Sequence, residues 1–137
     1  MNEPVSMRKQ IQQAVSFPMR VLEPVRDYLL QERVKLRKTA KSLDKEDPYK
    51  DPRRVDDNAA IDTDVAEHAD HDRVEAVRQE VRKSLINIRK ALTRIKLGRY
   101  GLCENCGRMI NTDRLAIKPT ADYCMACEQK VEKSGKK

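Results

Sequence analysis

The sequence has few of the residues that fill a large rounded core. It contains no tryptophan and one phenylalanine, and aromatic residues make up 4% of its 137 residues, whereas charged residues make up 37%. Such a chain cannot pack a broad core, so its apolar residues are expected along narrow helical seams. We therefore predict a small globular part joined to an extended one.

Long apolar runs and enzyme signatures are absent too. No stretch approaches the roughly 20 apolar residues of a membrane span, and the N-terminus lacks the apolar segment of a signal peptide. No Ser/His/Asp set, phosphate-binding loop or nucleotide fingerprint is found. We therefore predict a protein that is neither an enzyme nor bound to a membrane.

Acidic residues are concentrated in the middle of the chain. The net charge of +7 by itself suggests a nucleic-acid partner. However, Asp44 to Asp72 contains eleven acidic and four basic residues, a balance of −7, which leaves +14 for the rest. An acidic middle between basic flanks differs from a simple polyanion-binding surface.

The only four cysteines are Cys103, Cys106, Cys124 and Cys127. Two Cys-x-x-Cys pairs separated by 17 residues have the spacing of a four-thiolate zinc site. Two disulfides or two redox-active thiol pairs are the alternatives, but a redox site needs one pair only. Because four thiolates fill the tetrahedral zinc shell, we predict one structural zinc and no hydrolytic zinc chemistry. Cysteines arranged for metal, without a secretory signal, indicate the reducing cytoplasm.

Two segments repeat apolar residues every seven positions and are predicted as long helices. The first runs from Met19 to Glu46 and ends before Pro48, because the residue before a proline leaves the helical region. The second resumes near Asp62 or Asp64 and stops at Gly98. Their seam residues are Leu22, Leu29, Leu36 and Leu43, then Val74, Val81, Ile88 and Ile95 with Val77, Leu85 and Leu92 between them.

A polar link at 47–61, with two prolines and several Asp, joins these helices. We expect an antiparallel coiled-coil hairpin within one monomeric chain; pairing between two chains is the alternative. The predicted fold class is mainly α, a long antiparallel coiled-coil hairpin with a small four-cysteine zinc-finger base and a C-terminal helix. The predicted domains are an N-terminal segment packing near the base (1–18), the hairpin with an acidic tip around 47–66 (19–98), and the finger with its helix (99–137).

Within the finger we expect Gly107 to be left-handed and Thr120 to cap a helix that carries Cys124 and Cys127 through Val131. The apolar filling is predicted to be Met109, Ile110, Leu115 and Ile117. Near the N-terminus, Ser6 could cap a short helix. His68 and His71, with Asp64 and Asp72 at helical spacing, suggest either a second metal site or a solvated acidic face.

The finger residues resemble a known family. The stretches YGLCENCG at 100–107 and KPTADYCMAC at 118–127 closely resemble the DksA/TraR C4-type zinc-finger proteins. The order of long helices before them is also that of the family, so the likeness extends from about Met19 to the C-terminus. The resemblance implies a bacterial transcription factor that binds RNA polymerase without a DNA site of its own.

In that family the coiled coil enters the secondary channel of the polymerase and presents an acidic tip near the catalytic Mg²⁺, which modulates initiation. The family's tip element is Asp-x-x-Asp-x-Ala. Here Asp64 and Ala66 match its second half, Ile61 stands where the first Asp is expected, and Asp62 follows. The resemblance therefore implies a polymerase-modulating tip at Asp62, Asp64 and Ala66.

The family's site for guanosine tetraphosphate is altered here. Its three basic positions correspond to Asn87, Lys118 and Glu128, and the Glu128 carboxylate would repel a polyphosphate. We therefore predict weak or no binding of this nucleotide. Two other functions stay open at this point: a zinc ribbon that binds nucleic acid directly, and a coiled-coil adaptor whose zinc is purely structural.

Overall fold

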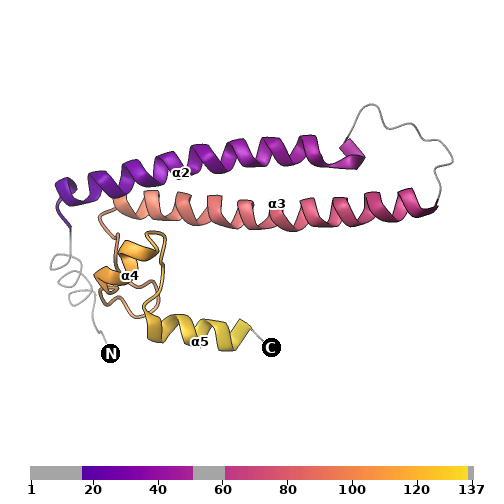
Figure 1. Cartoon of the computed structure of the whole chain (residues 1–137). Coiled ribbons are helices and arrows are strands. Elements are labelled where there is room, and N and C mark those ends of the chain that lie inside the picture. The colour runs from indigo at the N-terminus through magenta and orange to yellow at the C-terminus, as the bar shows by residue number, and fades with distance from the viewer. Residues whose placement is uncertain (1–16, 51–60, 136–137) are drawn as a thin grey trace. The chain divides into compact units, whose positions relative to one another are not determined.

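The structure is a computed structural model that describes residues 17–50 and 61–135, with the backbone alone described at 61–64. Its elements are helical, as Figure 1 shows. In chain order they are α2 (Met19–Glu46), the 3-10 helix η1 (Pro48–Lys50), α3 (Ile61–Lys96), α4 (Thr112–Ile117) and α5 (Met125–Gly135). In the described ranges an isolated antiparallel bridge between Leu102 and Met109 is the only strand-like pairing.

Helix α2 has the bounds predicted from the heptads. The Pro18 carbonyl accepts the N–H groups of Val21 (2.9 Å) and Leu22 (3.3 Å) and so begins the helix. Pro24 lies in the second turn, where its missing N–H removes one internal hydrogen bond. At the other end the Asp47 N–H still donates to the Leu43 carbonyl, and Pro48 then turns the chain into η1.

Helix α3 ends at the predicted glycine. Gly98 is left-handed, with φ of 69°. The Arg99 N–H donates back to the Arg94 carbonyl (2.9 Å), and the Gly98 N–H donates to the Ile95 carbonyl (3.3 Å). This pair of bonds is the Schellman arrangement, which satisfies carbonyls left open at a helix end and reverses the chain toward the finger.

The chain divides into two compact units, and both long helices run through both of them. The hairpin unit comprises residues 30–86. Its core joins Leu43 of α2 to Val74 and Val81 of α3, with Leu36, Ala40 and Leu85 packed against them. These seam residues come from both helices of one chain, as predicted for the intramolecular hairpin. With the four-cysteine cluster of the finger (below), this confirms the predicted fold class.

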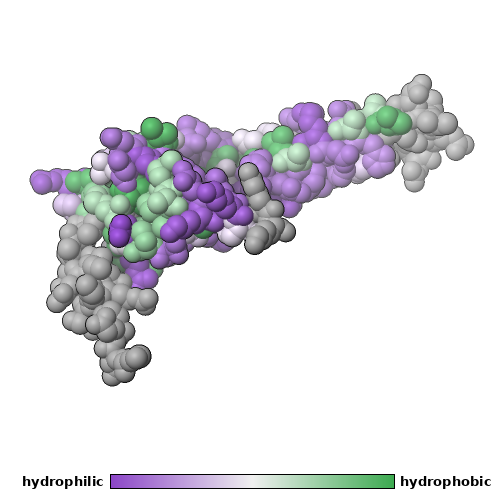
Figure 2. Space-filling model, turned by 90° about the horizontal axis from the view of Figure 1, so that it is seen from below, coloured by the Kyte–Doolittle hydropathy of each residue, from purple (hydrophilic) through white to green (hydrophobic). Residues whose placement is uncertain are grey.

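One seam position differs from the prediction. Val77, expected between the heptad residues, is 39% exposed, whereas Arg78 is 9% exposed. Arg78 lies four residues after Val74 and takes the inward position because its guanidinium pairs with Asp44 of α2 (3.0 Å) and with Asp47, which follows α2 (3.5 Å). Outside the seam, hydrophilic residues cover most of the helical surface visible in Figure 2, as expected for a narrow apolar stripe.

The finger unit comprises the described residues 17–29 and 87–135. Its buried apolar residues come from α2, α3 and the finger: Leu22, Leu29, Ile88, Ala91, Ile95, Tyr100, Ile110, Leu115 and Ala121. Phe17 packs edge-on against Tyr100, with ring centroids 6.4 Å apart. Gly101 is left-handed (φ 84°), and a Cβ there would lie 2.7 Å from the Phe17 ring, so this close packing requires glycine.

Two of the four predicted filling residues of the finger are correct. Ile110 and Leu115 are buried, but Met109 is 42% and Ile117 87% exposed. Met109 precedes Ile110 in an extended segment, where successive side chains point to opposite sides. Leu115 and Ile117 lie two apart on α4, so only one of them can face the core.

The start of the last helix was predicted wrongly. Thr120 lies in a turn, and α5 begins only at Met125. Residues 121–124 stay non-helical because the Asp122 carbonyl accepts the Glu104 N–H (2.9 Å), which holds this segment against the first cysteine pair. The helix α4 was not predicted; the Asn111 side chain caps it by accepting the Asp113 N–H at 2.8 Å.

The helix predicted after Ser6 lies outside the described residues, as do the side chains of Asp62 and Asp64. No helix in the described parts of the chain is both long and apolar enough to cross a membrane.

Candidate metal centre

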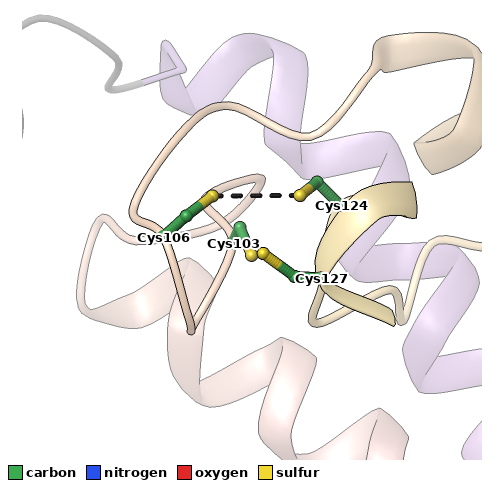
Figure 3. Close-up of side chains that lie close together, drawn as sticks. All are labelled: Cys103, Cys106, Cys124 and Cys127. Carbon is green, nitrogen blue, oxygen red and sulfur yellow. Dashed lines mark hydrogen bonds between the residues drawn. The ribbon is translucent and has the colours of Figure 1, made fainter. Parts of the chain in front are cut away.

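The four cysteine side chains converge from two segments (Figure 3). Their Sγ atoms all lie within 4.8 Å of one another, and those of Cys106 and Cys124 are 3.8 Å apart. Four sulfurs at about 2.3 Å from a tetrahedral zinc are about 3.8 Å from each other. None of the four forms a disulfide. The arrangement therefore fits a metal centre and disagrees with the disulfide alternative.

A tight backbone turn presents the first pair. The Cys103 N–H donates to the Arg108 carbonyl (2.8 Å), and the Gly107 N–H donates to the Cys103 carbonyl (2.9 Å). Gly107 has φ of 72°, so the left-handed glycine predicted at this position is confirmed. The second pair straddles the start of α5, where the Cys124 carbonyl accepts the Glu128 N–H and Cys127 lies in the first turn.

Hydrogen bonds and burial shift the pKa values of two of the thiols in opposite directions. Burial of the Cys103 thiol raises its pKa, but backbone N–H groups, including that of Cys106, outweigh burial and lower it to about 6. The Asn105 amide donates to the Cys127 sulfur (3.3 Å) and lowers its pKa, whereas Cys124, burial and the other sulfurs together raise it to about 11. Four such groups reach the thiolate state together only around a positive ion.

These residues fit one Zn²⁺, which would be held by four protein thiolates and would link the two cysteine pairs. Cys103 and Cys127 are buried, and thiolates would occupy all four positions of the tetrahedron. The predicted cofactor, a single structural zinc, agrees with this donor set. Within the described part of the chain, no other His, Cys, Asp or Glu residues converge in this way.

Arg94 connects the centre to α3 and was missed by sequence reasoning. Its guanidinium is 8% exposed and donates to the carbonyl of Ala121 (3.2 Å), the carboxylate of Asp122 (2.9 Å) and the carbonyl of Leu102. It therefore holds both cysteine segments against one helix. From the sequence, the position of Arg94 in the basic last turn of the second long helix predicts only that its charge interacts favourably with the helix end.

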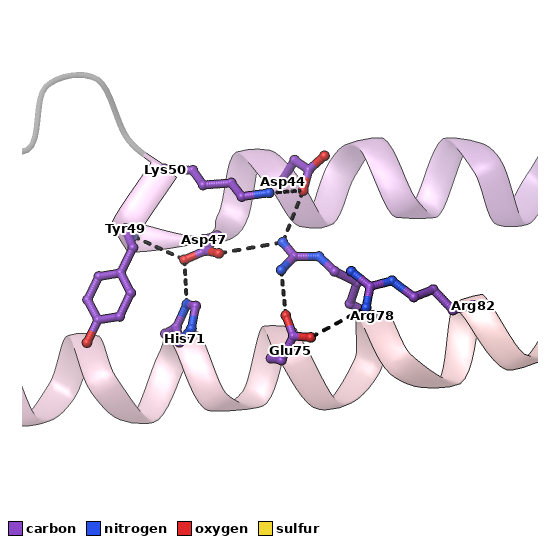
Figure 4. A network of polar contacts seen from close by, with 8 residues as sticks. All are labelled: Asp44, Asp47, Tyr49, Lys50, His71, Glu75, Arg78 and Arg82. Atoms are coloured by element: carbon purple, nitrogen blue, oxygen red, sulfur yellow. Dashed lines mark hydrogen bonds and ion pairs between the residues drawn. The ribbon is translucent and has the colours of Figure 1, made fainter.

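A second polar cluster lies in the hairpin unit, where α2 ends (Figure 4). Asp47 is 1% exposed and accepts hydrogen bonds from the Tyr49 N–H (3.1 Å) and His71 Nδ1 (3.0 Å). The His71 imidazole beside it is the main cause that holds the pKa of the Asp47 carboxyl below 3.8. We call Asp44, Asp47, Tyr49, Lys50, His68, His71, Glu75 and Arg78 the tip network.

The tip network engages both histidines that suggested a second metal site. His68 Nδ1 and the Tyr49 hydroxyl share a hydrogen bond of 2.7 Å, and His71 binds Asp47. Since His68 contacts Tyr49 whereas His71 contacts Asp47, the two rings have different partners, and the described side chains do not form a second metal site. Among the predicted tip residues, Asp62 lies in the first turn of α3 and Asp64 follows it, and Ala66 is exposed.

The residues at the three positions of the family's nucleotide site also lie in the finger unit; they are Asn87, Lys118 and Glu128. Glu128 pairs with Arg114 and, at 3.3 Å, with Lys118. Lys118, the one basic residue at these three positions, is thus already paired with a carboxylate.

Comparisons with known proteins agree with this geometry. Residues 98–133 match the family model described as the prokaryotic dksA/traR C4-type zinc finger. The RNA polymerase-binding transcription factor DksA of Escherichia coli K12 is 38% identical over 55 residues, 40% of this chain and 36% of that protein. An uncharacterized protein of Aquifex aeolicus is 42% identical over 50 residues, 36% of this chain and 34% of that protein. The match thus spans about a third of each relative.

A solved structure extends the likeness beyond the finger. Transcription factor DksA2 from Pseudomonas aeruginosa is similar with a TM-score of 0.72 and 25% identity, covering 96% of this chain and 100% of that one. By its cysteine motif and its sequence, the segment 98–133 is a zinc finger of the dksA/traR C4 type, and the chain as a whole is similar in fold to transcription factor DksA2.

Proposed function

We propose that this chain is a bacterial transcription regulator that binds RNA polymerase through its secondary channel. Its coiled-coil tip, with Asp62, Asp64 and Ala66, would lie near the polymerase active site and modulate initiation. The observation that carries the proposal is the likeness of 96% of the chain to the transcription factor DksA2. The relatives that are named as RNA polymerase-binding transcription factors add the partner.

The tip network supports a tip with a defined position. Tyr49 and Asp47 follow α2 and contact His68 and His71, which lie four and seven residues after Asp64 on α3. With about 3.6 residues per turn, these contacts lie within about two turns of Asp64. A regulator that acts by placing carboxylates near a metal-dependent active site needs a tip that is held in a defined position.

The proposal also covers the location, the oligomeric state and the activities that the protein lacks. It acts in the cytoplasm as a monomer, with no enzymatic activity and no DNA site of its own. The five aromatic residues are scattered along the sequence and offer no stacking platform for bases. The zinc keeps the finger folded and takes no part in chemistry.

Transcription in vitro with purified bacterial RNA polymerase tests the proposal. Asp62→Asn and Asp64→Asn should stay folded, keep zinc and still bind polymerase, yet lose much of the wild-type effect on initiation. Asp70→Asn is the matched control, because Asp70 is an exposed acid on the same helix, α3, but lies outside the proposed tip. It should act like the wild type.

Two other outcomes would replace the proposal. If the wild type ignores polymerase but binds free DNA with a steep salt dependence, the chain is a direct nucleic-acid binder. If it binds neither, the coiled-coil adaptor with structural zinc is the better description.

A further inference from the structure

The inward positions of the hairpin unit follow one another at steps of three and four residues, which is the spacing of a coiled-coil seam. On the α2 side they are Leu36, Ala40, Leu43 and Asp47. On α3 they are His71, Val74, Arg78, Val81 and Leu85. The seam is therefore apolar except at Asp47, His71 and Arg78.

These three polar residues meet across the hairpin, with the Asp47 carboxylate between the other two side chains (Figure 4). Asp47 continues the spacing of α2, because its N–H still donates to the Leu43 carbonyl at 3.1 Å. Its carboxylate lies 3.0 Å from His71 Nδ1 and 3.5 Å from the Arg78 guanidinium. Asp47 is 1% and Arg78 9% exposed, and they are the only buried charged residues among those described in this unit.

The apolar positions by themselves define the alignment of the two helices weakly. Aliphatic side chains recur at each step, so a slide of α3 along α2 by one step again places aliphatic residues opposite aliphatic residues. The slide moves α3 by about 5 Å, because a helix rises about 1.5 Å per residue.

The polar contacts, in contrast, are compatible with one alignment. Asp47 contacts two residues that lie seven apart on α3, and the guanidinium of Arg78 also pairs with Asp44 at 3.0 Å. A slide of about 5 Å cannot keep all these contacts, since a hydrogen bond spans about 3 Å. Polar groups that stay buried without their partners are costly.

We propose that Asp47 and Arg78 set the register of α3 against α2 and thereby fix how far Asp64 reaches along the hairpin. Asp64 precedes Arg78 by 14 residues on the same helix, so a slide of α3 carries Asp64 with it. A buried polar residue in an apolar seam specifies register in coiled coils in this way. The register follows from the contacts of the hairpin unit, and only its consequence at Asp64 rests on the proposed function.

The double variant Arg78→Leu/Asp47→Asn separates register from stability. It removes both buried charges, extends the apolar seam, and keeps a side-chain oxygen that can accept the Tyr49 N–H. Replacement of a buried ion pair by uncharged residues of similar size is often neutral or stabilising. We therefore expect the variant to melt at or above the wild-type temperature at pH 7, yet to lose its single alignment.

Spin labels on ketone side chains introduced at the exposed positions Lys45 and Asp70 report the alignment and leave the finger cysteines unmodified. Pulsed electron paramagnetic resonance on the monomeric, zinc-loaded chain should give one narrow distance for the wild type. The double variant should give a second distance, or a distribution broadened by about 5 Å.

Glu80→Gln/Lys83→Gln is the matched control. It also removes an ion pair from α3, but these side chains are 73% and 68% exposed and pair within the helix. This control should keep the wild-type distance distribution, because neither residue faces α2.

The outcomes distinguish the register from the proposed function. One unchanged distance in the double variant would overturn the register proposal, since other contacts would then set the alignment. A large fall in its melting temperature would overturn it as well, because the pair would act by stabilising the hairpin. With two registers about equally populated, the variant should show about half the wild-type effect on initiation by purified RNA polymerase. If the wild type has no effect on initiation, the proposed function fails while two distances in the variant still support the register proposal.

Discussion

Arg94 is a single side chain that joins three segments of the finger unit. It binds two carbonyls and the Asp122 carboxylate from one buried position. A neutral residue there leaves these acceptors without a donor in a protein interior, and unsatisfied buried groups are costly.

We predict that Arg94→Met destabilises the protein by about 3–5 kcal/mol, the usual cost of breaking a buried ion pair by removing one partner. Thermal melting with zinc present should show this as a loss of roughly 10 °C or more. Arg99→Met is the control, because Arg99 is exposed and its side chain has no ion pair with a described residue. Equal melting temperatures for the two variants would contradict the role assigned to Arg94.

Glu128 is one of the residues expected to weaken nucleotide binding by this finger. It pairs with both Lys118 and Arg114, and its own charge opposes a polyphosphate. We predict no submicromolar binding of guanosine tetraphosphate at physiological salt. Glu128→Lys should raise the affinity by releasing Lys118 and adding a cation. Calorimetric titration of both proteins measures this, and tight binding by the wild type would refute the prediction.

Among the elements, α2 and α3 are held together by two different means. Leu43, Val74 and Val81 form an apolar seam, and the tip network adds charged contacts where α2 ends. The seam is insensitive to pH, whereas the network depends on the ionised carboxylate of Asp47.

Asp47 should therefore give the hairpin an acid-sensitive contribution to stability. Its pKa is lowered below 3.8 in the folded chain, so its contribution is complete above the unfolded value and is lost as pH falls through the folded one. We predict that Asp47→Asn melts below the wild type at pH 7 and that the difference shrinks as pH falls below about 4. Melting curves from pH 7 to pH 3 measure it. A difference in melting temperature that does not change with pH would show that the Asp47 side chain stabilises the hairpin through its packing and not through its charge.

These elements also show what sequence patterns can predict. The heptads with Pro48 and Gly98 predicted both long helices closely, because periodicity and helix-breaking residues act locally. The metal centre was predictable because chelation depends on ligand type and spacing. Helix α4 was not, since six residues carry too little periodicity to be recognised. Nor were the buried positions of Arg78 and Arg94, since each binds a carboxylate far away in the sequence, at 34 and 28 residues.

In the whole molecule, the two units have different sources of stability. The hairpin unit relies on its apolar seam, while the finger unit combines buried apolar residues with the four-cysteine centre. Thiolate zinc contributes roughly 10–16 kcal/mol in small finger peptides, so the finger should depend on it.

Removal of zinc by a chelator should therefore unfold the finger first. α4 and α5 have 6 and 11 residues, against 28 and 36 in α2 and α3, so we expect a minor loss of helical ellipticity together with a lower melting temperature. Circular dichroism before and after chelation, with zinc added back, provides the measurement. Unchanged ellipticity and melting would show that the metal is dispensable for the fold.

The tip network has a further consequence for how the chain folds. Its contacts join residues that are closer in sequence than pairs farther along the two helices. Asp47 and His71 are separated by 24 positions, and Asp44 and Arg78 by 34. Loop-closure entropy rises with the length of chain enclosed, so the pairing nearest the turn costs least to form. Helix pairing is then expected to nucleate at the tip and to zip toward the finger, which makes Asp47, His71 and Arg78 early contacts in the folding transition state.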